Sequence, residues 1–413
     1  MIAACGQMEA VTLDQGDAVW PVVERLAKAA ADAGADLFVL PETTYPAYWL
    51  HSMERYMQPD ILRSAEVLRR FSTLARTHHF YLAAGFVEER NGKLFNSAAL
   101  FDRAGEVVGI ARKNFLWDCD NRWFAPGDSI AAWGTELGRV GMMICADCRA
   151  PEIAATLVAD GARMIILPTA WVNASKVRRT YRNVHPEFLI RARALEFGVP
   201  LVCCSKAGRE GEHLEYVGQS RIVAADGRTL AEAPTGGEHL IVSEVTLGEC
   251  KPTEADDKMR TRIMDRHPAY RAKTPGGKVI LNVKQGADAV ADALESSDAR
   301  VGRIAAAELG TFVAARYHAL TGAQVVVARG RAFEESFIRA RAAENRVFVV
   351  AGADSVQMVV APDGSVIFRE TDWDATVELD LSLADIKQFT PETDLWAQRR
   401  VECYRLPETA CVS

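Results

Sequence analysis

The sequence contains no long apolar run and no block of like charges. No apolar segment reaches the roughly 20 residues that a membrane-spanning helix requires. The N-terminal residues lack the basic segment and apolar stretch of a secretory signal. Lysine and arginine are not clustered and the net charge is -7, so a nucleic-acid-binding surface is not indicated. We therefore expect a cytoplasmic protein that acts on small molecules, with no nucleic-acid or membrane partner.

Signatures of metal binding and of a disulfide framework are also missing. The nine cysteines are an odd number scattered along the chain, which favours free thiols in a reducing compartment. Cys145 and Cys148 form one Cys-x-x-Cys motif, but neither a second such motif nor a spaced pair of histidines accompanies it. A redox pair or half of a zinc site is therefore not favoured, and we expect neither a metal nor another cofactor.

The composition is that of an ordinary globular protein. Hydrophobic residues make up 49% of the 413 residues and charged residues 25%, so the chain can form one large domain or two modest ones. Over roughly the first 250 residues, short apolar β-type runs alternate with helical patterns, which predicts an α/β sandwich. The predicted helices are 18–33, 60–77 and one that begins near Pro151, and the predicted strands are 37–40, 81–87, 97–101, 107–111 and 139–145.

Three of the predicted strands are followed at once by a reactive side chain. The strand 37–40 leads to Glu42, the strand 107–111 leads to Lys113, and the last strand runs into a strand-to-helix elbow at Cys145. Loops that follow the strands of such a sheet converge at one edge, so we expect these three side chains to lie together.

The order and context of these segments resemble the nitrilase superfamily. The segment from Cys145 to Glu152 is similar to the superfamily's amidase-type pattern Cys-x-Asp-x-Arg-x-Pro-Glu, and Leu-Pro-Thr-Ala-Trp at 167–171 fits the strand and loop that follow it. The resemblance covers roughly residues 1 to 271. It implies an α-β-β-α sandwich and a cysteine-dependent carbon–nitrogen hydrolase in which Glu42 is the base, Lys113 the electrostatic partner and Cys145 the nucleophile.

These implied roles agree with the chemistry of the side chains. A thiol is mostly protonated at neutral pH, so attack on an amide carbon needs a base such as Glu42 to remove the proton. The tetrahedral intermediate is an anion, which the Lys113 ammonium and the backbone amide after the nucleophile, that of Ala146, could stabilise. Glu42 would then protonate the leaving amine and activate the water that hydrolyses the thioester.

Each of the three residues has a simpler interpretation when it is taken alone. Glu42 could cap a following helix, Lys113 could be a surface residue at a strand end, and Cys145 could be an inert buried thiol. Their joint occurrence in the right order favours chemistry over these alternatives.

The loop 116–128 is predicted to line the substrate pocket. The superfamily usually has a second glutamate four residues before the aromatic of its Phe-x-x-Gly-Asp end, and Asp120 stands at that position. The shorter side chain would position Lys113 or the substrate less directly, and a solvated loop acid is the alternative. Apolar pocket walls are predicted from four aromatic residues, although such residues more often belong to a core: Tyr45, Trp117, Trp123 and Trp171.

The residues after the nucleophile indicate the reaction. Nitrile hydrolysers of the superfamily have Trp-Glu directly after the cysteine, whereas this chain has Ala146-Asp147. We therefore predict hydrolysis of a small carboxamide, or of an N-carbamoyl compound, to an acid and ammonia. An amine could instead capture the same thioester, which would make the chain an acyl transferase, and a non-catalytic binding protein is the remaining alternative.

The later part of the chain repeats part of this pattern. The matching segments keep their order, and the first two pairs share an offset of 161 residues: 139–141 with 300–302, 160–162 with 321–323, 190–196 with 338–344, and 226–227 with 363–364. At that offset Cys145 corresponds to Ala306, and the segments with Glu42 and Lys113 have no counterpart. We therefore predict a half copy without catalytic residues, the alternative being a chance likeness of two α/β segments.

The polar, breaker-rich stretch 248–277 is predicted to link the two parts. We expect a catalytic domain at residues 1–275 and a degenerate half domain at 276–413. Related enzymes pair their subunits through helices close to the nucleophile elbow, so a homo-oligomer is one expectation. The other is that the half copy takes the place of a partner subunit.

Overall fold

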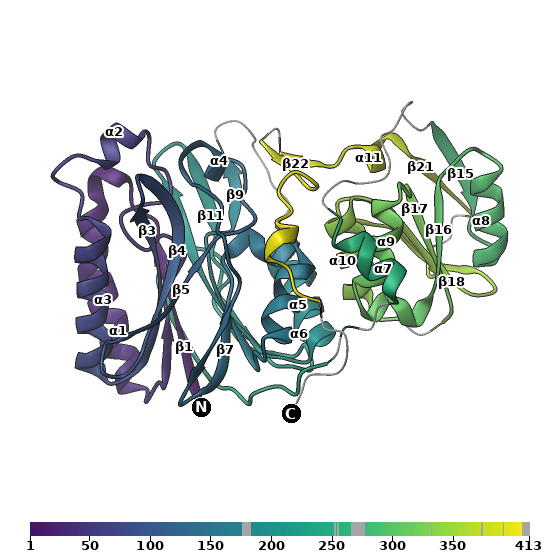
Figure 1. The fold of residues 1–413 in the computed structure, drawn as a ribbon. Coiled ribbons are helices and arrows are strands. Elements are labelled where there is room, and N and C mark those ends of the chain that lie inside the picture. The colour runs from purple at the N-terminus through teal and green to yellow at the C-terminus, as the bar shows by residue number, and fades with distance from the viewer. Residues whose placement is uncertain are drawn as a thin grey trace. The chain divides into compact units, whose positions relative to one another are not determined.

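The computed structural model divides the chain into two compact units, Met1–Lys251 and Pro252–Ala410 (Figure 1). The structure describes residues 1–175, 183–251, 253, 256–265, 277–331, 333–372, 375–390 and 392–406. The division lies upstream of the boundary near residue 275 that the polar stretch predicts, and residues 266–276 of that stretch lie outside the described residues.

The first unit is built on one large mixed sheet. The main path of the sheet has the order β5-β4-β3-β2-β1-β10-β8-β7-β6, with five shorter strands attached to it. Its strands are β1 Ile2–Glu9, β2 Leu37–Val39, β3 Tyr81–Arg90, β4 Lys93–Phe101, β5 Val107–Arg112, β6 Ala132–Thr135, β7 Gly138–Met142, β8 Met164–Thr169, β9 Val172–Ser175, β10 Leu201–Glu210, β11 Leu214–Val217, β12 Arg221–Val223, β13 Thr229–Glu232 and β14 His239–Glu244.

Helices cover the sheet on its two outer sides (Figure 1). Helices α1 and α3 pack on the part of the sheet that contains β1, β3 and β4, and α5 and α6 pack on the part that contains β7 and β12, so the two parts of the sheet form the inner layers of the predicted α-β-β-α sandwich. The helices of this unit are α1 Val19–Asp32, α2 Met53–Tyr56, α3 Ser64–His78, α4 Asp120–Trp123, α5 Pro151–Ala159 and α6 Ile190–Phe197, and a 3-10 turn spans Cys145–Arg149.

The local patterns explain why these segments pack as they do. In α1 the buried side chains include Val19, Val23, Leu26 and Ala30, which recur at helical spacing and form one face against the sheet. Strand β2 is buried on both faces, as expected of a parallel strand with neighbours on each side. The predicted helices at 18–33 and 60–77 and the predicted strand at 37–40 are therefore confirmed to within a few residues.

Strand direction brings the predicted reactive segments to one edge of the sheet. Strands β1, β2 and β3 are parallel to one another, and β10, β8 and β7 form a second parallel set that joins the first through β1. Glu42 lies in the segment after β2, and Cys145 lies in the segment after β7. Lys113 lies in the segment after β5, a strand that is antiparallel to its neighbour β4.

The second unit has a smaller sheet of its own. Strands β16, β17 and β18 are parallel, and β19 and β20 continue the sheet in antiparallel fashion. The elements of this unit are α7 Asp257–Ile263, β15 Lys278–Asn282, α8 Ala287–Glu295, β16 Val301–Ala305, α9 Val313–Leu320, β17 Val325–Arg329, α10 Glu335–Asn345, β18 Phe348–Gly352, β19 Val356–Val360, β20 Val366–Arg369, β21 Thr376–Asp380, α11 Ser382–Asp385, β22 Gln388–Thr390 and β23 Thr393–Asp394.

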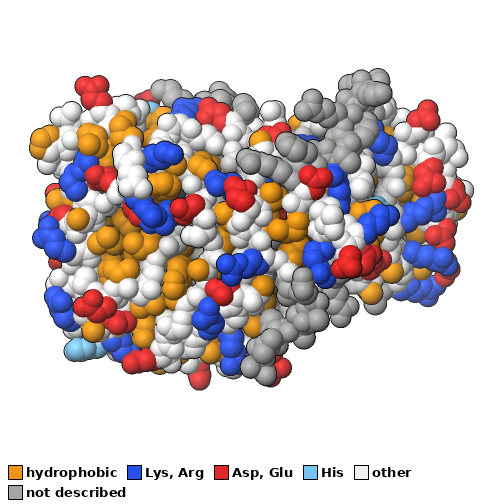
Figure 2. All heavy atoms as spheres, in the orientation of Figure 1, with side chains coloured by type: hydrophobic (Ala, Val, Ile, Leu, Met, Phe, Trp, Pro, Cys, Tyr) orange, Lys and Arg blue, Asp and Glu red, His pale blue; other side chains and the backbone are white. Residues whose placement is uncertain are grey.

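The surface of the molecule carries charges of both signs. On the face drawn in Figure 2, acidic and basic side chains are interspersed and do not gather into one large area of a single sign. None of the helices in the described part of the chain combines the length and the apolar character that a membrane-crossing helix requires.

Candidate active site

Glu42 lies in the irregular segment that follows β2, and its side chain is completely buried. One carboxylate oxygen, Oε1, accepts hydrogen bonds from Lys113 Nζ at 2.6 Å and from Asn96 Nδ2 at 2.7 Å. The other oxygen, Oε2, is buried and has no hydrogen-bond partner among the described residues. Because no helix begins at this segment, Glu42 is not a helix cap, and one of its oxygens is available to a further group.

Lys113 is held between two carboxylates. Its ammonium lies 2.6 Å from Glu42 Oε1 and 2.6 Å from Asp120 Oδ2, and all three side chains are closed to solvent. Asp120 also accepts hydrogen bonds from Asn96 Nδ2 at 3.3 Å and from the Trp117 backbone N–H at 2.8 Å. Asp120 is thus not a solvated loop acid. It contacts Lys113 directly, whereas the sequence predicted that its shorter side chain would position Lys113 or the substrate less directly than a glutamate.

Burial and charge set the proton affinities of this group. Burial raises the pKa of Glu42, the neighbouring Asp120 raises it further, and Lys113 opposes both effects. Burial by itself would lower the pKa of Lys113, but the carboxylates of Asp120 and Glu42 raise it well above its usual value. Lys113 is therefore a fixed cation, whereas Glu42 is a carboxylate whose affinity for a proton is increased.

Cys145 occupies the predicted elbow between β7 and α5. Its backbone φ is 47°, in the left-handed region that residues other than glycine rarely adopt, so the turn that presents its thiol is strained by about 1–3 kcal/mol. Cys145 as a whole residue is 8% exposed. Burial raises the pKa of Cys145 and so does the nearby Glu42 carboxylate, while Lys113 lowers it. The resting sulfur is accordingly a thiol that needs a base.

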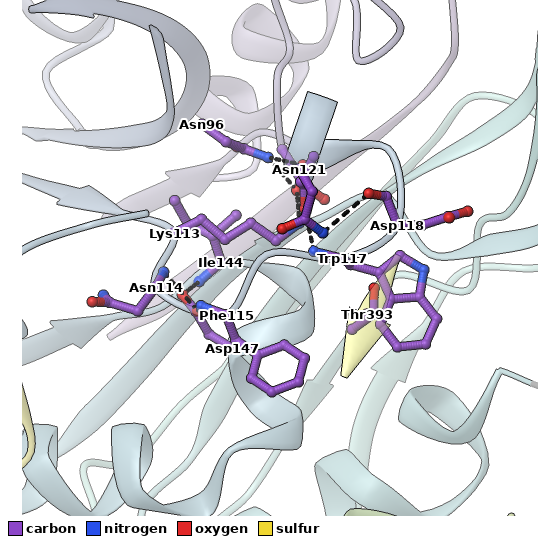
Figure 3. Close-up of polar contacts among 12 residues, drawn as sticks. Asn96, Lys113, Asn114, Phe115, Trp117, Asp118, Asn121, Ile144, Asp147 and Thr393 are labelled. Carbon is purple, nitrogen blue, oxygen red and sulfur yellow. Dashed lines mark hydrogen bonds and ion pairs between the residues drawn. The ribbon is translucent and has the colours of Figure 1, made fainter. Parts of the chain in front are cut away.

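Asp147 ties the elbow to the Lys113 segment. Its Oδ1 accepts the backbone N–H groups of Asn114 at 2.9 Å and Phe115 at 2.7 Å, and its Oδ2 accepts the N–H of Ile144 at 2.9 Å. Figure 3 shows these three backbone groups converging on the Asp147 side chain. Burial raises the pKa of Asp147 to about 7, against the effect of the three hydrogen bonds. The positions of Lys113 and Cys145 are therefore coupled through one carboxyl group.

Two of the predicted pocket aromatics lie beside this group. The ring of Trp117 is stacked by the Arg149 guanidinium at 4.4 Å, and its backbone N–H binds Asp120. Trp171 directly follows Ala170, whose backbone N–H lowers the pKa of the Cys145 thiol. The ring of Trp171 is buried and stacks on His185 at 5.9 Å.

Two further predicted aromatics are placed differently. Tyr45 stacks on Trp20 at 5.3 Å and its hydroxyl accepts the Leu62 N–H at 2.8 Å, so it is part of the core beneath α1 and α3. Trp123 packs on Trp49 at 4.9 Å. The ring of Tyr48 faces Lys113, with its centroid 5.5 Å from the ammonium.

Several buried polar residues around the site were not predicted from the sequence. Asn96 lies within the apolar strand β4 and bridges Glu42 and Asp120, and Lys206 and Glu210 lie on β10. A charged or amide side chain inside a mostly apolar strand is costly unless it has a function or a partner. That signal was present in the runs Leu-Phe-Asn-Ser-Ala-Ala-Leu and Leu-Val-Cys-Cys-Ser-Lys-Ala.

The residues described by the structure contain no group of three or more His, Cys, Asp or Glu side chains that could hold a metal ion. Cys148, the second member of the Cys-x-x-Cys motif, is fully buried.

Comparison with known proteins places this geometry in a family. The family model for carbon-nitrogen hydrolases matches residues 2–255. A hydrolase from Schizosaccharomyces pombe is 32% identical over 212 residues, which cover 49% of this chain and 64% of that protein, slightly under two thirds of its length. An omega-amidase from Xenopus tropicalis is 31% identical over 257 residues, which cover 60% of this chain and 88% of that protein.

A solved structure supports the same fold. The NitN amidase from Neterenkonia sp. AN1 superimposes with a TM-score of 0.54 at 24% identity, covering 60% of this chain and 93% of that chain. The residues matched by the family model are more than half of this chain and include Glu42, Lys113 and Cys145. The chain therefore belongs to the carbon-nitrogen hydrolase family, within the nitrilase superfamily that the sequence motifs resemble.

Proposed function

We propose that this chain hydrolyses the carbon–nitrogen bond of a small carboxamide through a thioester on Cys145, with release of ammonia and a carboxylic acid. The observation that carries the proposal is the buried array of Glu42, Lys113 and Asp120 beside the strained elbow of Cys145, in which Glu42 Oε2 has no partner among the described residues. Perturbed, buried titratable groups that converge in this way are characteristic of catalytic sites.

The first step is proton removal and attack. Glu42 Oε2 takes the proton of the Cys145 thiol while the sulfur forms a bond to the amide carbon. The raised pKa of Glu42 makes it a stronger base than an exposed carboxylate, which suits a thiol whose own pKa is raised by burial.

The second step depends on stabilisation of the tetrahedral anion. The Lys113 ammonium, fixed by two carboxylates, supplies a positive charge that needs no reorganisation, and the backbone N–H of Ala146 directly follows the nucleophile. Ala146 is 2% exposed, so water competes little with this donor.

The remaining steps return the enzyme to its starting state. The carbon–nitrogen bond breaks as the protonated Glu42 gives its proton to the leaving nitrogen, and ammonia departs. Glu42 then takes a proton from water as the water oxygen attacks the thioester carbon. The carbon–sulfur bond breaks, the acid leaves, and the proton returns to Cys145.

The reaction can be tested by measuring ammonia release from primary amides, N-carbamoyl amino acids and nitriles. We expect wild type to act on primary amides and to show an acyl adduct on Cys145 by intact mass. Cys145→Ala should lose both signals, and the matched variant Cys148→Ala should keep them. Ammonia release mainly from N-carbamoyl compounds would reassign the substrate. A product containing an added amine would reassign the chain to acyl transfer, and no adduct with any compound would favour a binding role.

We also propose that the second unit is a half copy of the catalytic fold. Its strands β16, β17, β18 and β19 follow one another with the same directions as β7, β8, β10 and β12. Side-chain contacts agree with this correspondence. Arg193 Nε donates to the Cys148 carbonyl at 3.1 Å, and Arg341 Nε donates to the Leu309 carbonyl at 3.1 Å.

The corresponding position in the half copy lacks the catalytic groups. Asp147 accepts the N–H of Ile144, and Glu308 likewise accepts the N–H of Ala305, so Ala306 stands in the place of Cys145. We expect the double variant Cys145→Ala/Ala306→Cys to be as inactive as Cys145→Ala, because no counterpart of Glu42 accompanies the new thiol. Restored ammonia release would contradict the assignment.

A further inference from the structure

Asn96 is a buried amide within the largely apolar strand β4. Its residue is fully closed to solvent, and its side-chain carbonyl oxygen Oδ1 is buried without a hydrogen-bond partner in the described part of the chain. A buried polar atom that is left unpaired destabilises the fold, so stability alone would favour an apolar side chain at this position. The amide nitrogen of Asn96 must therefore supply something that an apolar residue cannot.

The amide nitrogen of Asn96 donates to two carboxyl groups at once. It lies 2.7 Å from Glu42 Oε1 and 3.3 Å from Asp120 Oδ1. The Lys113 ammonium contacts the same two side chains, at 2.6 Å from Glu42 Oε1 and 2.6 Å from Asp120 Oδ2. The four side chains thus form a closed ring in which two donors alternate with two acids. Because a carboxylate only accepts hydrogen bonds, this ring requires the nitrogen of the amide, and not its oxygen, to face the acids.

The backbone of Asn96 joins the segments that carry the other members of this ring. Its carbonyl accepts the Lys113 N–H at 2.9 Å. On the opposite edge of β4, Asn96 is paired with Val87 of β3, and the Val87 N–H donates to the Tyr45 carbonyl at 3.3 Å, in the loop that also contains Glu42. Asn96 therefore stands on a regular strand between the two loops. A side chain on a strand is held more precisely than one on a loop.

These contacts distinguish the two carboxylate oxygens of Glu42. Oε1 accepts hydrogen bonds from both Asn96 and Lys113, whereas Oε2 has no partner among the residues that the structure describes. The last torsion of a glutamate side chain is broad and roughly two-fold, so a carboxylate held by Lys113 alone would be free to exchange its oxygens. A second donor on a different strand opposes this rotation, because turning the carboxylate breaks both hydrogen bonds.

We propose that Asn96 is a positioning residue that holds Oε1 of Glu42, so that Oε2 remains the oxygen that takes the proton of Cys145. This inference rests on the proposed amidase chemistry, in which Glu42 is the base. Asn96 acts through that base and not on the reacting atoms. Its amide does for the carboxylate what Asp120 does for the ammonium of Lys113, and both keep a charged group in the geometry that the reaction needs.

The proton affinity of Glu42 makes this role measurable. The Asn96 hydrogen bond lowers the pKa of Glu42, whereas the neighbouring Asp120 raises it. Removal of Asn96 and removal of the Asp120 charge should therefore shift this pKa in opposite directions. The titratable side chains whose charges interact with Glu42, all unchanged in an Asn96 variant, are Tyr48, Lys113, Asp120, Cys145, Lys206 and Tyr216.

The kinetic test uses two variants of Asn96 and one matched control. Asn96→Leu keeps nearly the same shape and loses both amide contacts, and Asn96→Ser loses them without added bulk. Asn345 of α10 is an equally buried asparagine in the second unit. Its nitrogen donates to the Arg341 carbonyl at 2.9 Å, and its Oδ1 is likewise without a partner in the described residues. Asn345→Leu therefore reproduces the loss of a buried amide away from the proposed base.

Ammonia release from the best primary amide is measured against pH with each variant. We expect kcat to fall roughly 10- to 100-fold in both Asn96 variants, with KM little changed. The acid limb of kcat/KM should move to higher pH in these variants, because the pKa of Glu42 rises when its hydrogen bond from Asn96 is lost. The same limb should move to lower pH in Asp120→Asn, and Asn345→Leu should keep the wild-type profile. A purely structural role for Asn96 would leave the limb in place.

A second measurement separates this inference from the proposed reaction. The rate of Cys145 alkylation by iodoacetamide is followed by intact mass across the same pH range, so that no turnover is needed. A midpoint that moves up in the Asn96 variants and down in Asp120→Asn supports the inference even if wild type releases no ammonia from any amide. An unmoved midpoint, together with normal ammonia release, would leave the amidase function standing and overturn the role of Asn96. Failure of both Asn96 variants to fold, judged by circular dichroism, would assign Asn96 to the fold instead and would also overturn the proposal.

Discussion

The ammonium of Lys113 lies 2.6 Å from Oδ2 of Asp120, with both side chains closed to solvent. Asp120 is the first residue of the short helix α4, and its backbone N–H donates to the Trp117 carbonyl at 2.9 Å. The Asp120 side chain therefore reaches the Lys113 ammonium from the first residue of this turn. The contact makes Asp120 a positioning residue for Lys113.

Asp120→Asn should lower both stability and activity. Removal of one partner from a buried ion pair costs about 3–5 kcal/mol, and displacement of Lys113 should reduce kcat roughly 10- to 100-fold. Because Asp120 raises the pKa of Glu42 and that of Lys113, both limbs of the pH–rate profile should move to lower pH in the variant. Denaturant unfolding and kcat measured against pH check these effects.

The exposed residue Asp128 provides a control in the same loop. Its side chain is 66% exposed and lies 3.9 Å from Arg112, so Asp128→Asn should change neither the unfolding free energy nor the pH profile appreciably. An Asp120→Asn profile that keeps both limbs in place would reduce Asp120 to a structural role.

Glu42→Gln should nearly abolish hydrolysis while the fold is retained. The glutamine oxygen can still accept hydrogen bonds from Lys113 and Asn96, but the amide nitrogen in place of Oε2 cannot take a proton. We expect kcat to fall about 10³-fold, and alkylation of Cys145 by iodoacetamide, followed by intact mass, to slow as well. Glu24→Gln, on the exposed face of α1, serves as the control. Undiminished turnover by Glu42→Gln would remove Glu42 from the proposed chemistry.

Gly85→Ala should move the base without touching the substrate. Gly85 lies on β3, and a β-carbon there would stand 2.6 Å from Glu42 Cα and still closer to the Pro41 carbonyl oxygen. The Glu42 segment would have to shift, with a stability loss of about 1–3 kcal/mol and a roughly 100-fold loss of kcat. Gly134→Ala, where a β-carbon meets nothing within 4 Å, should leave kcat unchanged. An equal kcat for Gly85→Ala and Gly134→Ala would refute the close packing of Gly85 against the Glu42 segment.

Asp147 should make stability depend on pH. Burial raises its pKa from 3.8 to about 7, so between about pH 4 and pH 7 the native state binds more protons at this group than the unfolded chain does. Its contribution to stability is therefore complete below about pH 4 and is lost as pH rises to about 7, by up to about 4 kcal/mol. Urea unfolding across this range should show the advantage of wild type over Asp147→Asn shrinking as pH rises. An advantage that is constant, or that grows with pH, would contradict the prediction.

The sequence was most informative where local patterns carry the structure. Helical spacing predicted α1, and the buried runs before Glu42 and Cys145 predicted the strands that bring those residues to one edge, because strand direction follows from chain order in α/β units. Side-chain orientation in irregular segments has no such period. Tyr45 and Tyr48 lie in the same loop after β2, and only the fold decides that Tyr48 faces Lys113.

Interior polar groups were harder to predict. Alternation along a strand predicts which face a residue lies on, but it does not say that Asn96 will bridge two carboxylates or that Lys206 Nζ will have no hydrogen-bond partner among the described residues. Both depend on contacts between strands that are distant in the sequence. The sequence predicted that Asp120 positions Lys113 or the substrate, but not that the contact with Lys113 is direct, because the α4 turn that carries Asp120 is a feature of backbone geometry.

The buried array of Glu42, Lys113 and Asp120 contains two carboxyl groups and a single ammonium. When the thiol proton of Cys145 passes to Glu42, a thiolate appears as a carboxylate disappears, and the total charge enclosed by the protein does not change. The reaction moves a negative charge within the protein interior, from oxygen to sulfur and then to the substrate, and it creates no new charge there. The chemical step therefore leaves the enclosed charge unchanged, and its rate constant should be insensitive to ionic strength.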